Sequence, residues 1–363
     1  MTAAAAFRGQ FPVLERTAYL NAGTEGPLPS AAAEAASQRI ELELTGGRCG
    51  RAYMTAVMEL ADELRARYAR VLGTDPDSVA LTGSTTDGVN TVLGGLDLRR
   101  GDRIVTSDEE HPGLLAPLAR ARDLHGVELV VVPFPEIAGA VTADTRLVAC
   151  SHVSWVSGRV VDHEALAQTG VPLLLDAAQG IGAVPVDLDA LGCAFYAASG
   201  QKWLCGPEGS GCLFVHPDHL DDLSTPWPGF KSLADPHEPL TSPPAEHASR
   251  LDHGFPPGLR SVCALASLGV FEDAGWDWVH GRAAELAARL AERLAERGLE
   301  VGPRGRSTLV SYQATADVDD EVARLASEGF VVRSIASHGY IRVSVGAWSS
   351  EDELDELVRV AAL

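Results

Sequence analysis

Short apolar stretches alternate with amphipathic stretches through the middle of the chain. Six of the apolar stretches are expected to be strands: SVAL (78–81), RIVTS (103–107), VELVVV, RLVACS, VPLLLD and AFYAAS. The first two lead into the helical patterns TTDGVNTVLGGL and LLAPLARARDLHG. Several of these strands are apolar at nearly every position, so both of their faces must be covered. The pattern therefore predicts a doubly wound α/β layer whose sheet is mostly parallel.

The flanking regions have different patterns. Helical periodicity over residues 54–72 ends at Gly73, and residues 227–257 are rich in Pro, His, Ser and Asp, which is typical of an irregular surface segment. Further helices and strands are expected after that segment: helices at 259–274 and 278–297, strands at TLVSYQ and YIRVSV, and a last helix at EDELDELVRVAAL. The last hundred residues therefore predict a smaller α+β lobe.

Size and charge narrow the class of protein. A chain of 363 residues exceeds the length at which one core usually divides, so two domains are expected: a large one at 22–254 and a small one from 1–21 plus 255–363. The net charge of −21 opposes binding to nucleic acid or to anionic lipid. A small molecule is the better candidate for a ligand.

Location and metal binding can also be judged from composition. The N-terminus lacks a basic stretch followed by an apolar run, and no apolar run reaches the roughly 18 residues of a membrane helix, so we expect a cytoplasmic protein. Six cysteines form no CxxC pair and no zinc-type spacing. We expect reduced, packed thiols and no metal site.

Lysine is rare in this chain. Only Lys202 and Lys231 are found among 29 basic residues, and the others are arginines. A guanidinium stays protonated, whereas the surroundings of a lysine can deprotonate its amine, so any amine chemistry has two candidates. Lys231 lies in the turn PGFKS and fits a solvated surface residue, while Lys202 follows an apolar strand, where an unpaired ammonium is costly. Lys202 is the favoured candidate.

Polar residues follow the ends of two neighbouring predicted strands. VPLLLD ends in Asp176, with Gln179 three residues later, and AFYAAS ends in Ser199, just before Lys202. Ligands of open α/β sheets bind outside the carboxyl ends of the strands, so these side chains are expected to share one crevice. Taken alone, Asp176 could equally be the cap of the next helix.

Two further motifs follow strands. In LTGSTTDGVN, the residues Ser84, Thr85 and Thr86 open a helix whose N-terminus suits a phosphate, although Ser84 and Asp87 also have the spacing of an ordinary capping box. In SDEEHPGLL, His111 opens another helix. A lone histidine is more often structural unless a flat ligand lies beside it.

Together these motifs closely resemble the class V aminotransferase (cysteine desulfurase-like) family of fold-type I enzymes, which use pyridoxal 5′-phosphate (PLP). The resemblance runs from YLNAGTEGPLP to RVSVGAW, and its core is DAAQ…SGQKW…GPEGSG. It implies a role for each residue that matches a family position: Ser84, Thr85, Thr86 and Ser199 at the phosphate, His111 stacked on the pyridine ring, Asp176 at the pyridine nitrogen, Gln179 beside the phenolic oxygen, Lys202 as the Schiff-base lysine, Arg342 at the substrate α-carboxylate, Asn21 and Trp155 near the substrate, and Gly254 at the cofactor.

The chemistry implied by these roles is consistent. Asp176 would keep the pyridine nitrogen protonated, which makes the ring an electron sink, and Lys202 would move the proton of the substrate Cα. The resemblance also implies a homodimer in which the segment 250–258 reaches the phosphate of the partner subunit.

Several positions depart from the family pattern. No cysteine follows Cys263, and VVRSIASHGYIRVSV lacks the loop that carries the persulfide cysteine of desulfurases. Gln201, Trp155 and Phe255 replace a His, an Asn and a Thr of many relatives. These changes argue against sulfur transfer through a persulfide and leave the cofactor residues in place.

We therefore expect a C–S β-lyase that acts on an S-substituted cysteine and releases a thiol or sulfenate with pyruvate and ammonia. The alternatives are an epimerase, an aminotransferase or a decarboxylating deaminase of a cysteine-derived amino acid in secondary metabolism. A catalytically silent scaffold or regulator is a hypothesis of another class. The set of Asp176, Lys202 and Arg342 argues against it, because convergent titratable groups mark active sites.

Overall fold

A seven-stranded sheet forms the centre of the larger lobe in the computed structural model, which describes residues 2–362. Its strands are β2 (Val79–Thr82), β3 (Arg103–Ser107), β4 (Glu128–Val132), β5 (Thr145–Ser151), β6 (Leu173–Asp176), β7 (Phe195–Ser199) and β8 (Gly211–Val215). The strand order is β2-β8-β7-β6-β5-β3-β4, and all neighbours are parallel except those of β8. The predicted doubly wound, mostly parallel α/β layer is confirmed.

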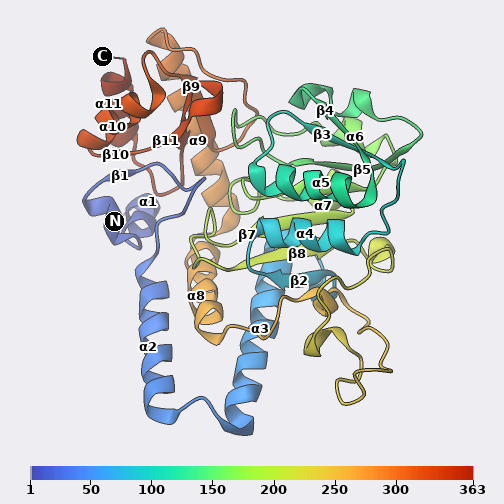
Figure 1. Cartoon of the computed structure of the whole chain (residues 1–363). Coiled ribbons are helices and arrows are strands. Elements are labelled where there is room, and N and C mark those ends of the chain that lie inside the picture. Colours follow the sequence, from blue (N-terminus) through green and yellow to red (C-terminus); the bar gives the residue numbers. More distant parts are fainter. Residues whose placement is uncertain (1, 363) are drawn as a thin grey trace.

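Helices cover both faces of this sheet, as the uninterrupted apolar strands require. One face packs against α3 (Gly50–Leu72), α6 (His163–Ala167), α7 (Leu188–Leu191) and α8 (Gly258–Ala274), and the other against α4 (Thr85–Gly95) and α5 (Pro112–His125). Successive side chains of a strand point to opposite faces. Leu173 and Leu175 of β6 accordingly lie in the first cluster, and Leu174 lies in the second. Figure 1 shows α4 and α5 side by side along the sheet.

Besides the short helices α6 and α7, one strand and one long helix of the large lobe have no counterpart among the predicted elements. The strand β8 lies in a glycine-rich stretch that looks like a loop in the sequence, yet it pairs with β7 on one side and β2 on the other. The helix α2 (Ser30–Gly46) packs against α8, and together with α3 it extends away from the body of the molecule (Figure 1). Exposed apolar side chains of α2, such as Leu42 and Leu44, remain uncovered in one chain.

The smaller lobe contains residues from both the N-terminal and the C-terminal part of the chain. It contains a three-stranded antiparallel sheet in the order β11 (Arg333–Ile335), β12 (Tyr340–Ser344), β9 (Leu309–Gln313), and a parallel pair of β1 (Ala18–Tyr19) with β10 (Phe330–Val331). Its helices are α1 (Ala3–Arg8), α9 (Trp276–Glu296), α10 (Val318–Ser327) and α11 (Glu351–Ala361). Leu20 packs with Leu290, Val343 and Leu357 in one apolar cluster. The exact domain boundaries at residues 21 and 254 remain a prediction.

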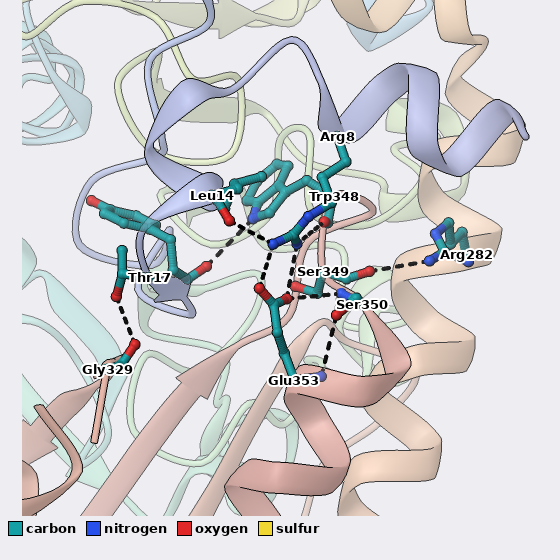
Figure 2. A network of polar contacts seen from close by, with 10 residues as sticks. Arg8, Leu14, Thr17, Arg282, Gly329, Trp348, Ser349, Ser350 and Glu353 are labelled. Carbon is teal, nitrogen blue, oxygen red and sulfur yellow. Dashed lines mark hydrogen bonds and ion pairs between the residues drawn. The ribbon is translucent and has the colours of Figure 1, made fainter. Parts of the chain in front are cut away.

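A polar network fixes the N-terminal segment to the C-terminal helix (Figure 2). The Arg8 guanidinium forms an ion pair with Glu353 and donates to the carbonyl oxygens of Leu14 and Trp348, at 2.8 and 2.9 Å. Arg282 of α9 donates to the carbonyl oxygen of Ser349 at 3.1 Å. Residues almost 350 positions apart thus hold the start of the chain against α11 and the loop before it.

The expected irregular segment at 227–257 contains only short 3-10 helices. The 3-10 helices of the molecule are η1 (Pro12–Glu15), η2 (Pro76–Ser78), η3 (Phe134–Glu136), η4 (Ala138–Ala140), η5 (Pro217–His219), η6 (Phe230–Ser232), η7 (Ala248–Leu251) and η8 (Ala336–His338). Within residues 2–362, no helix has both the length and the apolar character needed to span a bilayer.

Candidate active site

A cavity of about 220 Å³ lies at the carboxyl ends of the parallel strands. Each of β2, β3, β5, β6 and β7 delivers residues to it through the loop that follows the strand, which is where ligands of such sheets bind. The cavity brings together ten of the twelve predicted site residues: Ser84, Thr85, Thr86, His111, Trp155, Asp176, Gln179, Ser199, Lys202 and Arg342.

Lys202 lies in the loop after β7 and lines this cavity. Burial lowers the pKa of its amine to about 8, the nearby Arg342 acts in the same direction, and Asp176 opposes both. A fraction of the amine is therefore unprotonated at neutral pH, which a nucleophile or a base requires. Lys231 lies in η6 and does not line the cavity.

Asp176 is the last residue of β6, and its carboxylate is buried. Oδ1 accepts a hydrogen bond of 3.0 Å from the backbone N–H of Ala178, while Oδ2 forms none within the described chain. Burial raises the pKa of this carboxyl, and the charge of Lys202 opposes the rise. The Asp176 side chain therefore both caps the next turn and faces the cavity. The sequence had left these two roles as alternatives.

The loop between β2 and α4 supplies hydroxyl and amide groups at a helix N-terminus. Ser84 is the N-cap of α4, and its Oγ accepts the Asp87 N–H at 3.1 Å. The Thr85 N–H donates to Ser199 Oγ at 3.0 Å, and the two hydroxyls of Thr85 and Ser199 are 2.7 Å apart. A Cβ at Gly83 would lie 2.6 Å from Asp87 Oδ2, so a larger residue there would displace the Asp87 carboxylate. Such a turn is suited to a phosphate.

His111 is the N-cap of α5. Its Nδ1 accepts the Gly113 N–H at 2.9 Å, and its ring meets the Trp155 ring edge-on with centroids 4.9 Å apart. Burial lowers the pKa of His111 to about 4, and the charges of Lys202 and Arg342 contribute to the shift. The imidazole is therefore neutral at physiological pH, so a flat aromatic ligand would stack on an uncharged ring.

Arg342 of β12 is a buried cation without an acidic partner in the described chain. Its Nη1 donates to the Trp155 carbonyl oxygen at 3.0 Å, its Nη2 donates to Thr24 Oγ1 at 3.2 Å, and its Nε has no hydrogen bond. Burial lowers its pKa to about 9, with a smaller effect from Arg333. A buried guanidinium of this kind is suited to a carboxylate of a ligand.

Gln179 is held by two neighbours. Its Nε2 donates to the Gly23 carbonyl oxygen at 2.7 Å, and its Oε1 accepts the Trp203 indole N–H at 2.8 Å. The side chain is buried and its amide orientation is fixed by these partners. Nε2 has a second hydrogen that is free to donate to a ligand oxygen in the cavity.

Two predicted site residues do not line the cavity. Asn21 reaches it only through Thr24, whose hydroxyl donates to Asn21 Oδ1 at 2.8 Å and accepts from Arg342. Gly254 lies in a separate pocket with Phe255 and Arg260. Within one chain, Gly254 is therefore outside the candidate active site.

Some lining residues were missed by sequence reasoning. Gly23, Thr24 and Glu25 come from the turn-rich stretch before α2, and Arg333 comes from β11, where it pairs in register with Arg342. The stretch NAGTEGPLP carried a usable signal, since it combines a carboxylate with turn residues. Nothing in the local sequence around Arg333 indicates that its strand borders the crevice.

Comparison with known proteins places this geometry in a family. The family model described as Aminotransferase class-V matches residues 19–357. The chain belongs to this family. Among its relatives, isopenicillin N epimerase of Streptomyces clavuligerus is 32% identical over 70% of this chain, and a probable cysteine desulfurase of Methanothermobacter thermautotrophicus is 31% identical over 60% of it. These matches span 66% and 57% of the two relatives' own lengths.

Solved structures agree with this one over nearly the full chain. The cystine C–S lyase C-DES, in complex with its reaction product cysteine persulfide, superimposes with a TM-score of 0.91, 26% identity and coverage of 97% and 99% of the two chains. A C-DES mutant with glycine covalently linked to the PLP cofactor gives a TM-score of 0.92 at 26% identity, covering 98% of each chain. The fold is that of the PLP-dependent cysteine desulfurases and C–S lyases.

The cofactor of this class-V enzyme is PLP, and the residues present fit it. Lys202 would hold it covalently, Ser84, Thr85, Thr86 and Ser199 would bind the phosphate, and Asp176 would face the pyridine nitrogen. The hydroxyl-lined helix N-terminus, the unpaired Asp176 Oδ2 and the neutral His111 ring match a phosphate, a pyridinium and an aromatic plane. When bound, PLP supplies an electron sink for a carbanion at the substrate Cα.

Proposed function

We propose that this class-V enzyme is a C–S β-lyase that acts on S-substituted cysteines. The overall reaction is R–S–CH₂–CH(NH₃⁺)–COO⁻ + H₂O → R–SH + pyruvate + NH₄⁺. The bond from Cβ to sulfur breaks, and sulfur leaves with the electron pair. A disulfide substrate releases a persulfide, and a sulfoxide releases a sulfenic acid.

One observation carries this proposal: no cysteine lines the cavity. The strands β11 and β12 are joined by the short η8 turn, which contains no cysteine and leaves no room for a mobile loop. Cys263 is buried in α8, and burial raises the pKa of its thiol. A thiolate or persulfide that leaves unaided needs no such nucleophile, whereas sulfur transfer to the enzyme does.

Arg342, Lys202 and His111 have separate roles in the proposed reaction. Arg342 holds the α-carboxylate, because its buried guanidinium has spare donors and no protein acid. Lys202 takes the proton from Cα, since its depressed pKa lets the free amine act as a base near neutral pH. His111 is neutral, so it would cover the plane of the pyridine ring without adding a positive charge near the ring nitrogen that Asp176 would face.

Purified protein loaded with PLP tests this proposal directly. Incubation with cystine, with cysteine thioethers and with their sulfoxides should yield pyruvate and ammonia in equal amounts, together with one thiol, persulfide or sulfenic acid for each pyruvate. Exchange of the Cα proton with deuterium in D₂O without pyruvate would show that elimination is the wrong reaction.

Alkylation of thiols provides a second readout. Cys49 is the exposed cysteine in the described chain, and the other five are buried. N-ethylmaleimide should therefore modify Cys49 and leave the rate of pyruvate formation unchanged in the wild type and in Cys49→Ser. Loss of activity that tracks modification of any cysteine would instead favour a persulfide mechanism.

Epimerisation is the second candidate, favoured by the match to isopenicillin N epimerase. It needs the same removal of a proton from Cα by Lys202, followed by return of the proton to the opposite face. An aminotransferase or a decarboxylating deaminase would also begin with the same groups. Chiral analysis of the recovered amino acid, with assays for the keto acid and carbon dioxide, distinguishes these outcomes from elimination.

A further inference from the structure

Glu25 is the one carboxylate lining the cavity besides Asp176. Within residues 2–362, its side chain forms neither a hydrogen bond nor an ion pair. The proposed chemistry assigns roles to Lys202, Asp176 and Arg342 but none to Glu25. A partly buried carboxylate without a partner is costly, and a cation on a ligand would offset that cost.

The backbone around Glu25 is fixed against the loop that carries Lys202. The Glu25 carbonyl oxygen accepts the Tyr19 hydroxyl at 3.0 Å, and the Gly26 N–H donates to the Gln201 carbonyl oxygen at 2.8 Å. A Cβ on Gly26 would lie 2.0 Å from the Lys202 carbonyl oxygen, so the two segments are in direct contact. Glu25 is therefore a fixed feature of the cavity wall beside Lys202.

Electrostatic coupling agrees with this placement. Burial raises the pKa of Glu25, the neighbouring Glu208 raises it further, and Lys202 lowers it. Glu208 is exposed and does not line the cavity. Glu25 is thus the carboxylate of the cavity wall beside Lys202, in a cavity that also contains the cations Arg342 and Arg333.

The cation that meets Glu25 must come from the far end of the substrate. The α-carboxylate is assigned to Arg342, and the α-amino group of an amino acid would be bound by the PLP that Lys202 would hold. Neither group at Cα is therefore available to Glu25. What remains is the part of the substrate beyond sulfur.

We propose that Glu25 binds an ammonium group on the part of the substrate beyond sulfur. The preferred substrates are then disulfides or thioethers that join cysteine to a second, amine-bearing group. This inference rests on the proposed C–S lyase function and adds the chemical class of the leaving group. Glu25 is in this sense a specificity-determining residue.

Three disulfides of cysteine test the inference, using the PLP-loaded enzyme. Cystine carries a distal ammonium and a distal carboxylate, the mixed disulfide with 3-mercaptopropionate lacks only the ammonium, and the mixed disulfide with cysteamine lacks only the carboxylate. In Glu25→Gln, kcat/KM should fall about tenfold or more for cystine and for the cysteamine disulfide, because each loses a charge-assisted contact. It should change less than about twofold for the 3-mercaptopropionate disulfide, where no such contact forms.

Glu208→Gln is the matched control, since it removes the same charge close by but outside the cavity wall. It should change kcat/KM by less than about twofold for all three disulfides, as expected for a solvent-screened charge. An equal loss on all three substrates in Glu25→Gln would overturn the inference, because Glu25 would then serve a step common to every substrate. Equal activity of both enzymes on all three would overturn it as well. No pyruvate from any disulfide with the wild type would instead overturn the proposed function.

Discussion

At the scale of single residues, the proposed chemistry depends on one amine in an unusual environment. Lys202 is one of two lysines in 363 residues, and burial moves its pKa from 10.5 to about 8. Asp176 limits this shift because its negative charge favours the ammonium. The surroundings of Lys202, including Asp176, therefore set what fraction of the Lys202 amine is unprotonated at neutral pH.

This pKa predicts how the cofactor-free protein takes up PLP. Only the unprotonated amine attacks the aldehyde, so the rate of uptake should rise with pH and level off above a midpoint near 8. The visible absorbance of the bound cofactor measures this rate in a stopped-flow series from pH 6 to 10. A midpoint near the ordinary lysine value of 10.5 would contradict the proposed environment of Lys202.

Substitution of each lysine identifies the amine involved. Lys202→Ala should abolish the covalent absorbance and lower the rate of pyruvate formation by about a thousandfold or more. Lys231→Ala is the matched control and should retain both, because Lys231 lies outside the cavity. Circular dichroism of the two variants verifies that the fold is intact.

At the scale of elements, a buried carboxyl links the ends of two parallel strands beneath the cavity. Glu110 accepts hydrogen bonds of 2.5 Å from Ser107 Oγ at the end of β3 and from Ser151 Oγ at the end of β5. Ser151 pairs in register with Asp176 of β6, and His111 follows Glu110 directly. Glu110 thus fixes the strand ends that present two proposed cofactor residues.

Burial raises the pKa of Glu110 from 4.5 to about 7, against the effect of its two hydrogen bonds. The folded state binds this proton more tightly than the unfolded state, so the stability it contributes is full below pH 4.5 and is lost as pH rises to about 7. The free energy of unfolding of the wild type relative to Glu110→Gln should therefore fall by about 3 kcal/mol over that range and stay constant above it.

Urea unfolding of both proteins at several pH values measures this difference. Other titrating groups, such as His111 and His152, occur in both proteins and cancel in the comparison. Parallel curves for the two proteins from pH 4 to 8 would show that Glu110 does not carry the raised pKa.

At the scale of the whole molecule, apolar surface is left uncovered in a single chain. Leu42 and Leu44 of α2 are 60% and 77% exposed, and Phe255 and Leu259 near the start of α8 are 51% and 41% exposed. Because α2 packs against α8, these side chains belong to one region of the molecule. Patches of this kind mark sites of association. We infer that a second copy of the chain covers this region and that Gly254 approaches the partner's site there.

Charge placed in this region should separate the subunits. The double variant Leu42→Glu and Leu44→Glu should weaken dimerisation by about a hundredfold or more, since two charges would lose water on association. If the partner subunit completes the phosphate site, the double variant should also bind PLP more weakly. Analytical ultracentrifugation and PLP titration measure both effects.

Leu124→Glu is the matched control, because Leu124 is 59% exposed on α5, away from α2 and α8. It should leave the dimer and the affinity for PLP unchanged. An active wild-type species that sediments as a 38.2 kDa monomer would contradict the inferred homodimer.

The sequence by itself determined the layered α/β fold and most of the residues that line the candidate site. Uninterrupted apolar strands such as Leu173–Asp176 have to be covered on both faces, and the carboxyl ends of parallel strands meet at one edge. Residues at the ends of those strands or just beyond them, including Asp176 and Lys202, must therefore converge. The absence of a cysteine between Cys263 and Leu363 was equally readable, since the order of residues alone establishes it.

Only the tertiary structure decided which distant segments complete the cavity. Glu25 and Arg342 are more than three hundred residues apart, and no local pattern shows that the chain start and β12 border the same crevice. The structure also placed Gly254 in another pocket and Asn21 behind Thr24. The physical reason is that periodicity and spacing report local conformation, whereas contacts between lobes depend on packing across the whole chain.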